Sequence, residues 1–248
     1  MYYIFDGSYY GLLTCVFEAF SLKEYNIRVQ SENRYVADMF GSSRNIDTDV
    51  EKAKRILVGL RKKMNATEVH NFFRAYLAED AKAYQCIFNL IVRGFMTSFA
   101  MLEDFGNPDV LYLSNTLKQV GREHHRMKAF VRFQKSNDGL YYALVDPDFN
   151  VLPLLASFFK NRYADQRWMI YDTKRNYGLM YDLKAVVEVQ AQEVDPGAVF
   201  GVGATIELDN NELKYQRLWQ QYFKSTTIEA RKNLKLHIQH VPKRYWKY

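Results

Sequence analysis

One stretch of alternating residues constrains the fold of this chain more than any other. Between residues 127 and 133, apolar side chains at the odd positions alternate with Lys128, Phe130 and Arg132. A period of two is typical of a half-buried β-strand. The sequence S-N-D-G at 136–139 contains an Asp-Gly pair, which favours a tight reversal of the chain. The stretch therefore predicts an antiparallel hairpin, with one strand over 127–133 and a second over 140–145.

The outward face of this predicted strand has two interpretations. Lys128, Phe130 and Arg132 place an aromatic ring between two cations, which suits stacking on bases and contact with phosphates. The same arrangement is typical of a solvated sheet face on which long basic side chains cover apolar surface. Taken alone, the stripe favours the solvated face.

The remaining patterns predict an α+β fold. Strands are expected over 2–5, 167–171, 177–181 and 186–191, and helices over 9–20, 50–64, 69–77, 80–99, 108–126, 152–163 and 212–223. Residues 27–36 suit a strand or an extended linker, and residues 41–45 suit a loop. This order predicts a helical N-terminal part, a central antiparallel sheet with an inserted helix, and a helical C-terminal segment. We expect a single domain over 1–248, mainly helical in 1–117 and sheet-containing in 118–248.

Charge is distributed unevenly along the chain, which carries a formal net charge of +6. The segments 51–63, 118–135 and 225–248 are strongly basic, whereas 185–213 contains acidic residues and no Lys or Arg. Such a distribution predicts an electrostatically one-sided surface and an anionic partner.

The chain lacks the residues that several classes of function need. The two cysteines, Cys15 and Cys86, lie in apolar helical contexts and are expected to be buried, reduced thiols in a cytoplasmic protein. Two cysteines cannot supply a four-thiolate iron–sulfur cluster or zinc site, so no cofactor and no metal are expected. No secretory signal and no membrane-spanning run is present, and the serine-hydrolase, zinc-protease and phosphate-loop motifs are absent.

Two further groups of residues could contact an anion or each other. Arg122, His125 and Arg126 share one face of the expected helix, which is either anion-facing or merely solvated. Asp172 and Arg175 flank a tight turn and could form a buried pair or a local turn bond. For this second group, the structural role is favoured.

The C-terminal tail mixes cations with aromatic rings. Its sequence includes I-E-A-R-K-N and ends in V-P-K-R-Y-W-K-Y. Arg and aromatic side chains together suit phosphate contact and base stacking. The alternative is that the tail docks Trp246 into the core.

Long, ordered stretches resemble a known bacterial family. They include I-F-D-G-S-Y-Y-G-L-L-T-C-V-F-E-A-F at the start, H-R-M-K-A-F-V-R-F, L-Y-Y-A-L-V-D-P-D and R-W-M-I-Y-D-T-K-R in the middle, and V-P-K-R-Y-W-K-Y at the end. The family is assigned to DNA repair or DNA metabolism, contains a domain of unknown function and is encoded beside a radical-SAM protein. In some bacteria the domain is fused to a uracil-DNA glycosylase-like domain.

This chain departs from the family pattern at two histidine positions. The pattern has a histidine after the Pro-Asp pair and another before the helix phenylalanine, where this chain has Phe149 and Phe158. Histidine chemistry is therefore not expected there. The catalytic motifs of the glycosylase and the three-cysteine motif of radical-SAM enzymes are also absent, so neither activity is expected of this chain alone.

The resemblance and the charge pattern together predict a DNA-binding accessory protein that works with a radical-SAM partner. The alternatives are an enzyme acting on a nucleotide or base, with Asp172 and a nearby histidine as acid and base, and a protein-interaction module without nucleic-acid binding. No catalytic residue is assigned. The residues expected to contact phosphates are Arg126, Lys128, Arg132, Arg175, Arg231, Lys232 and Arg244, and those expected to stack on bases are Phe130, Tyr245 and Trp246.

Overall fold

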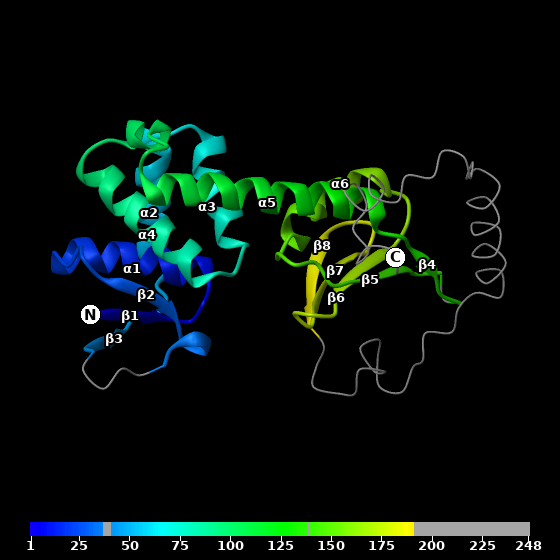
Figure 1. Cartoon of the computed structure of the whole chain (residues 1–248). Coiled ribbons are helices and arrows are strands. Elements are labelled where there is room, and N and C mark those ends of the chain that lie inside the picture. Colours follow the sequence, from blue (N-terminus) through cyan, green and yellow to red (C-terminus); the bar gives the residue numbers. More distant parts are fainter. Residues whose placement is uncertain (37–40, 138, 191–248) are drawn as a thin grey trace, which may run out of the picture. The chain divides into compact units, whose positions relative to one another are not determined.

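The structure is a computed structural model that describes residues 1–36, 41–137 and 139–190. It confirms the α+β class (Figure 1). The chain divides into two compact units, Met1–Arg122 and Glu123–Tyr248. The expectation of a single domain over 1–248 stays a prediction. The predicted helix 212–223 and the C-terminal tail lie outside the described residues.

The first unit contains a three-stranded parallel sheet. Its central strand β1 (Tyr2–Phe5) pairs with β2 (Arg28–Ser31) on one side and with β3 (Ser43–Asn45) on the other. Helix α1 (Tyr9–Leu22) connects β1 to β2, as a parallel connection requires. The prediction of a loop over 41–45 was wrong, because β3 is a polar, three-residue strand with no apolar alternation to reveal it.

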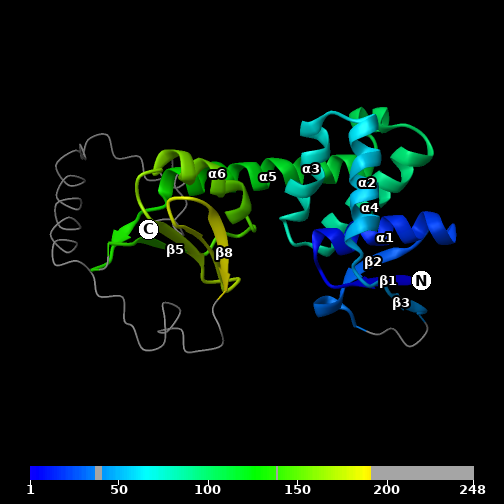
Figure 2. The ribbon, with the colours of Figure 1, turned by 180° about the vertical axis from the view of Figure 1, so that it is seen from behind.

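Helices cover one side of this sheet in both views (Figures 1 and 2). They are α1, α2 (Val50–Lys63), α3 (Ala66–Tyr76) and α4 (Ala81–Met96). Two short 3-10 helices elsewhere in this unit span Glu32–Arg34 and Phe99–Glu103. All four α-helices begin at a side-chain cap, which is Ser8 for α1, Asp49 for α2 and Asp80 for α4. Asn65 and Glu68 form a reciprocal capping box at the start of α3.

A chain of polar side chains joins α4 to its neighbours. Gln85 donates to the Ile27 carbonyl at 3.0 Å and accepts from the Val29 amide at 2.9 Å, which ties α4 to β2. Asn89 bridges Gln85 to Asp109, at the start of α5 (Pro108–Phe130). These bonds satisfy polar groups beside an otherwise apolar core, formed where α1 and α4 pack against β1 and β2.

The second unit contains a five-stranded mixed sheet in the order β4-β5-β6-β7-β8. The strands are β4 (Gln134–Lys135), β5 (Tyr141–Val145), β6 (Trp168–Asp172), β7 (Tyr177–Tyr181) and β8 (Val186–Gln190). The predicted central sheet was antiparallel throughout, but β5 and β6 pair in parallel. The inserted helix α6 (Leu152–Arg162) explains this, because a helical crossover returns the chain to the same end of the sheet.

The predicted hairpin is confirmed at its turn, its antiparallel pairing and its second strand, which is β5. Gly139 has a φ of 81°, its amide bonds the Ser136 carbonyl at 3.0 Å, and β4 pairs antiparallel with β5. The strand predicted over 127–133 was wrong, because α5 continues to Phe130 and β4 begins only at Gln134. Along α5 and just beyond it, the buried residues Val120, Met127 and Val131 follow a helical rather than a strand period.

Aromatic rings fill the space between α6 and the sheet. Phe133 makes edge contacts with Phe159 and Tyr163, at centroid distances of 5.5 and 5.4 Å. Trp168 on β6 is fully buried and lies between Phe159 and Tyr181. This cluster fixes the segment that follows α5 and thereby positions the predicted basic residues around it.

Candidate nucleic-acid interface and an aromatic cavity

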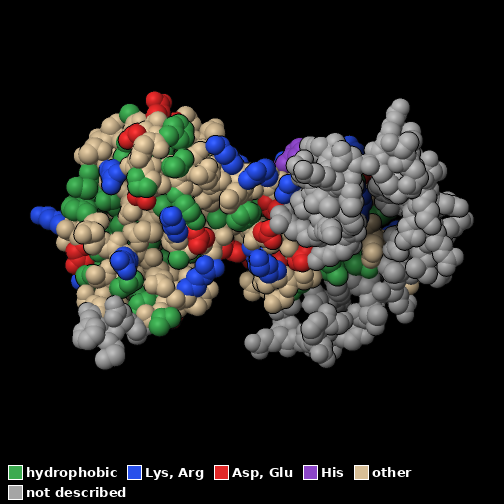
Figure 3. Space-filling view, viewed as in Figure 1, with side chains coloured by type: hydrophobic (Ala, Val, Ile, Leu, Met, Phe, Trp, Pro, Cys, Tyr) green, Lys and Arg blue, Asp and Glu red, His purple; other side chains and the backbone are tan. Residues whose placement is uncertain are grey.

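The C-terminal part of α5 has a buried inner face and a basic outer face. Glu123 and Met127 are buried, whereas His125 is exposed and Arg126 is partly exposed. Figure 3 shows Lys and Arg side chains following the visible part of α5. The helical geometry thus groups these residues differently from the predicted strand, on which Lys128, Phe130 and Arg132 would all have shared one face.

Arg132 and Lys128 remain at the surface but are engaged in local contacts. Arg132 is exposed, and its Nη1 atom donates to the carbonyls of Ala129 at 2.7 Å and Val131 at 3.1 Å. These bonds satisfy carbonyls at the C-terminal end of α5, where a cation is electrostatically favourable. The Nζ atom of Lys128 lies 5.0 Å from the ring centre of Phe158, a cation–π contact.

The remaining residues of the predicted interface fall into two groups. Phe130 is half-buried at the end of α5, so its ring is not a fully exposed stacking platform. Arg231, Lys232, Arg244, Tyr245 and Trp246 lie outside the described residues. The structure brings Arg126, Lys128, Phe130 and Arg132 together at one helix end, while the contribution of the tail stays a prediction.

Arg175 is tied into its own turn. Its Nη1 atom lies 2.8 Å from Asp172 Oδ2 and 3.0 Å from the Pro147 carbonyl, and its Nη2 atom lies 3.1 Å from the Asp148 carbonyl. Asp172 is fully buried and also accepts from the Lys174 and Arg175 amides. The structural role favoured by the sequence is confirmed. The same contacts occupy the carboxylate that the enzyme alternative assigns to acid–base chemistry.

The neighbouring acidic and imidazole groups also have structural partners. Buried Glu123 accepts from the Asp148 amide at 3.1 Å, and His124 Nε2 lies 3.0 Å from the Leu154 carbonyl. Both contacts join α5 to the segment containing α6. In the part of the chain that the structure describes, no three His, Cys, Asp or Glu residues are grouped to hold a metal ion.

The two cysteines are buried, as predicted. Burial raises the pKa of the Cys15 thiol well above its usual range. Burial and a hydrogen bond to Asp109 raise the pKa of the Cys86 thiol to about 12. Both side chains are therefore neutral thiols near pH 7, which suits packing rather than nucleophilic chemistry.

Among the helices of the described residues, none is long and apolar enough to span a bilayer.

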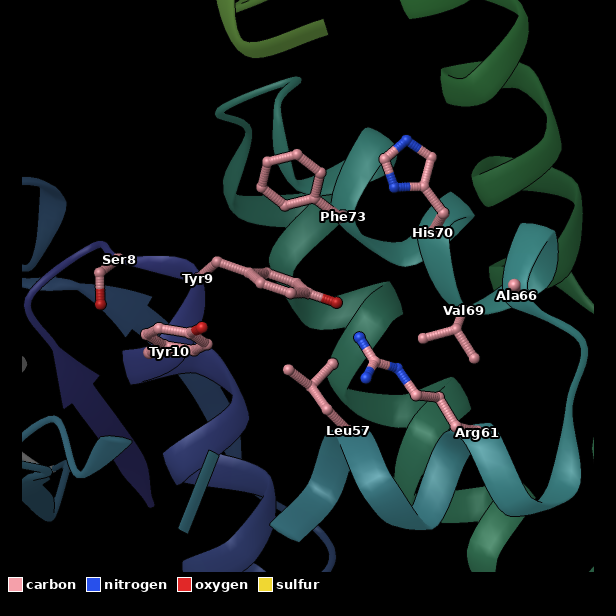
Figure 4. A pocket seen from close by; sticks show the side chains of 9 residues that line it. All are labelled: Ser8, Tyr9, Tyr10, Leu57, Arg61, Ala66, Val69, His70 and Phe73. Carbon is pink, nitrogen blue, oxygen red and sulfur yellow. The ribbon is translucent and has the colours of Figure 1, made fainter. Parts of the chain in front are cut away.

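Sequence reasoning missed a cavity of about 570 Å³ in the first unit (Figure 4). It lies among the N-terminal end of α1, α2 and α3. Its lining is aromatic and cationic, and is formed by Ser8, Tyr9, Tyr10, Leu57, Arg61, Ala66, Val69, His70 and Phe73. The paired tyrosines at 9 and 10 were the available sequence signal, but nothing in their local pattern shows that they line a cavity.

The hydroxyl group of Tyr9 is buried beside this cavity. It has no hydrogen-bond partner among the described residues. Burial raises the pKa of Tyr9, with a smaller contribution from Tyr10, so the hydroxyl stays protonated and is a donor. Buried polar groups without a partner are uncommon in folded proteins.

Residues 81–248 match the family model described as a domain of unknown function, DUF4130. This chain belongs to that family. No curated protein matches the chain. The DUF4130 match begins at the first residue of α4 and contains all the residues of the predicted interface. The cavity-lining residues all precede it.

Proposed function

We propose that this DUF4130 protein is a DNA-binding accessory protein that works with a radical-SAM partner. The observation that carries the proposal is the basic end of α5. There, exposed Arg132 and partly exposed Arg126 and Lys128 lie within two helical turns, beside the ring of Phe158. Cations grouped in this way neutralise neighbouring phosphates, and binding releases counterions from the nucleic acid.

The local contacts of these basic residues indicate how they would bind phosphates. Arg132 is held by two carbonyls, so part of its side-chain entropy is already lost before a phosphate arrives. Lys128 is likewise held over Phe158. None of these contacts reads a base, so we expect binding that depends on phosphate geometry and is largely independent of sequence.

The partner is inferred from the family resemblance given above. A radical-SAM enzyme needs its own iron–sulfur cluster, and the two buried cysteines of this chain would leave the cluster to the partner. In this arrangement the present chain holds DNA and the partner carries out the chemistry.

Fluorescence anisotropy with labelled single- and double-stranded oligonucleotides across a salt series tests the proposal. We expect affinity to fall steeply with salt. Removing two phosphate contacts with Arg126→Ala/Arg132→Ala should flatten the log–log slope by roughly 0.7 to 0.9 per contact. The matched control is Arg162→Ala/Lys184→Ala, which removes the same charge from exposed positions of the same unit and should leave the slope unchanged.

Two results would overturn the proposal. One is the absence of binding at low salt to either kind of oligonucleotide. The other is an Arg126→Ala/Arg132→Ala variant that binds as tightly, and with the same salt slope, as the parent chain. In either case, the protein-interaction module is the better interpretation of the basic surface.

A further inference from the structure

The cavity in the first unit has the size of a small-molecule site. Its volume of about 570 Å³ falls within the range in which proteins enclose ligands of a few rings. Its walls come from three helices, so the lining is held by the core and not by a loop. Figure 4 shows Tyr9, His70 and Phe73 around one part of the space, and Leu57 and Arg61 on the α2 side.

The aromatic wall is preorganised for a planar ring. Tyr9 contacts Phe73 edge to face at a centroid distance of 5.3 Å, and it contacts Tyr76 at 5.2 Å. His70 lies 5.8 Å from Phe73. These contacts hold the rings before any ligand arrives, which lowers the entropic cost of stacking a flat heterocycle on them.

The opposite side of the cavity presents a cation. Arg61 is exposed, and within the described ranges it makes no hydrogen bond, ion pair or ring contact. Figure 4 shows its guanidinium pointing into the same space as the Tyr9 hydroxyl. A guanidinium has a planar set of donors that matches the oxygens of a phosphate. No Asp or Glu is among the residues that line the cavity, so this charge is not neutralised within its wall.

One further donor favours an anion with acceptor oxygens. The start of α1 does not supply it, because Ser8 Oγ caps the Gly11 amide and Asp6 Oδ1 accepts from the Ser8 amide. The Tyr9 hydroxyl adds a donor that has no partner among the described residues.

We propose that this cavity binds one nucleoside monophosphate unit, with the base against Tyr9 and Phe73 and the phosphate at Arg61. The base supplies the flat ring and the phosphate supplies the anion. The same chemistry is present in a free nucleotide and at the 5′-phosphorylated end of a strand. The proposal does not rest on DNA binding by α5, because none of its residues belongs to the basic end of that helix.

Isothermal titration calorimetry on the full chain tests the site. The probes are the four deoxynucleoside 5′-monophosphates, the matching nucleosides and inorganic phosphate. We expect Arg61→Ala to weaken nucleotide binding by at least about tenfold, because it removes a charge-assisted hydrogen bond. It should change nucleoside binding by less than about twofold. Lys62→Ala, the neighbouring exposed cation on α2, is the matched control and should leave both affinities unchanged.

A second variant tests the aromatic wall. Phe73→Leu keeps an apolar side chain but removes the ring, so it should weaken nucleotide and nucleoside binding alike. Circular dichroism melts establish that each variant is folded before it is titrated. A folded Phe73→Leu variant that binds both ligands as the parent does would contradict the assignment of the base to this wall.

A competition experiment separates the two sources of the ligand. If a 5′-phosphorylated oligonucleotide displaces the nucleotide and loses affinity in Arg61→Ala, the site takes a strand end. If it does not compete, the site takes a free nucleotide. The proposal is overturned if no nucleotide binds at about 1 mM, or if Arg61→Ala binds as tightly as the parent. Salt-dependent DNA binding through Arg126 and Arg132 would persist in Arg61→Ala, so the two proposals fail separately.

Discussion

Replacing Arg175 by Ala gives the sharpest test of how the second unit is held together. The side chains of Arg175 and Asp172 are only 10% and 0% exposed, and their closest atoms are 2.8 Å apart. The substitution leaves a buried carboxylate without its cation, and it removes the Arg175 donors from the carbonyls of Pro147 and Asp148. Losing one partner of a buried pair costs about 3–5 kcal/mol. That is a large part of the roughly 5–15 kcal/mol that stabilises a typical domain.

Two companion variants separate charge from geometry. Arg175→Lys keeps the positive charge but lacks the planar fork that reaches Asp172 and the two carbonyls together, so we expect an intermediate loss. The double variant Asp172→Asn/Arg175→Ala leaves no unpaired buried charge at this position. It should therefore be less destabilised than the sum of the two single variants.

Urea unfolding followed by circular dichroism measures the loss of stability. Hydrogen exchange of peptides covering β6 and β7 shows whether the loss is centred on this turn. The reasoning is refuted if Arg175→Ala lowers the free energy of unfolding by less than about 1 kcal/mol. If that variant keeps its stability but loses oligonucleotide binding, Arg175 is a phosphate ligand, as the sequence-based prediction had it.

Two further predictions concern packing and pH. Gly178→Ala should destabilise the second unit by about 1–3 kcal/mol, because a Cβ atom there would lie 2.7 Å from the Ile170 carbonyl oxygen. Gly121→Ala, whose Cβ would meet only the mobile end of Arg74, should be nearly neutral in the same melts. A hydrogen bond from Tyr3, helped by Arg44, holds the pKa of Glu24 below its usual range. This contribution is present above the ordinary carboxyl pKa and is lost as pH falls through the lowered one, so Tyr3→Phe should flatten the acid limb of a stability–pH curve.

The sequence predicted elements whose signals are local. The caps at Ser8, Asp49 and Asp80 mark the starts of α1, α2 and α4, as expected of residues whose side chains bond the first helical amides. The turn at 136–139 was also predicted, because Gly139 needs the positive φ that glycine readily adopts.

The errors arose where one pattern fits two structures. Met127 and Val131 are four residues apart, a spacing that places both on one face of a strand and also on one face of a helix. Only the longer series from Val120 separates the two, and it favours the helix. The parallel pairing of β5 with β6 depends on long-range packing, although the inserted helix was a usable signal for it.

The sequence predicted one of the two candidate sites and missed the other. Charge clusters are visible in a sequence, so the basic end of α5 was predicted, although its residues were placed on a strand and not on a helix. The cavity is built from residues on three helices, and only the fold brings Tyr9, Arg61 and Phe73 together. A burial pattern alone cannot distinguish a ring that lines a cavity from one that fills a core.

The family match begins at residue 81, where α4 starts, yet α4 buries its apolar face against elements that precede it. Ile87 and Leu90 belong to the same core as Leu12 and Val29. The family match therefore begins at residue 81, whereas the hydrophobic core continues across that residue into the segment before it. In any relative that has the matched region without the preceding 80 residues, another segment or another molecule must cover this helix.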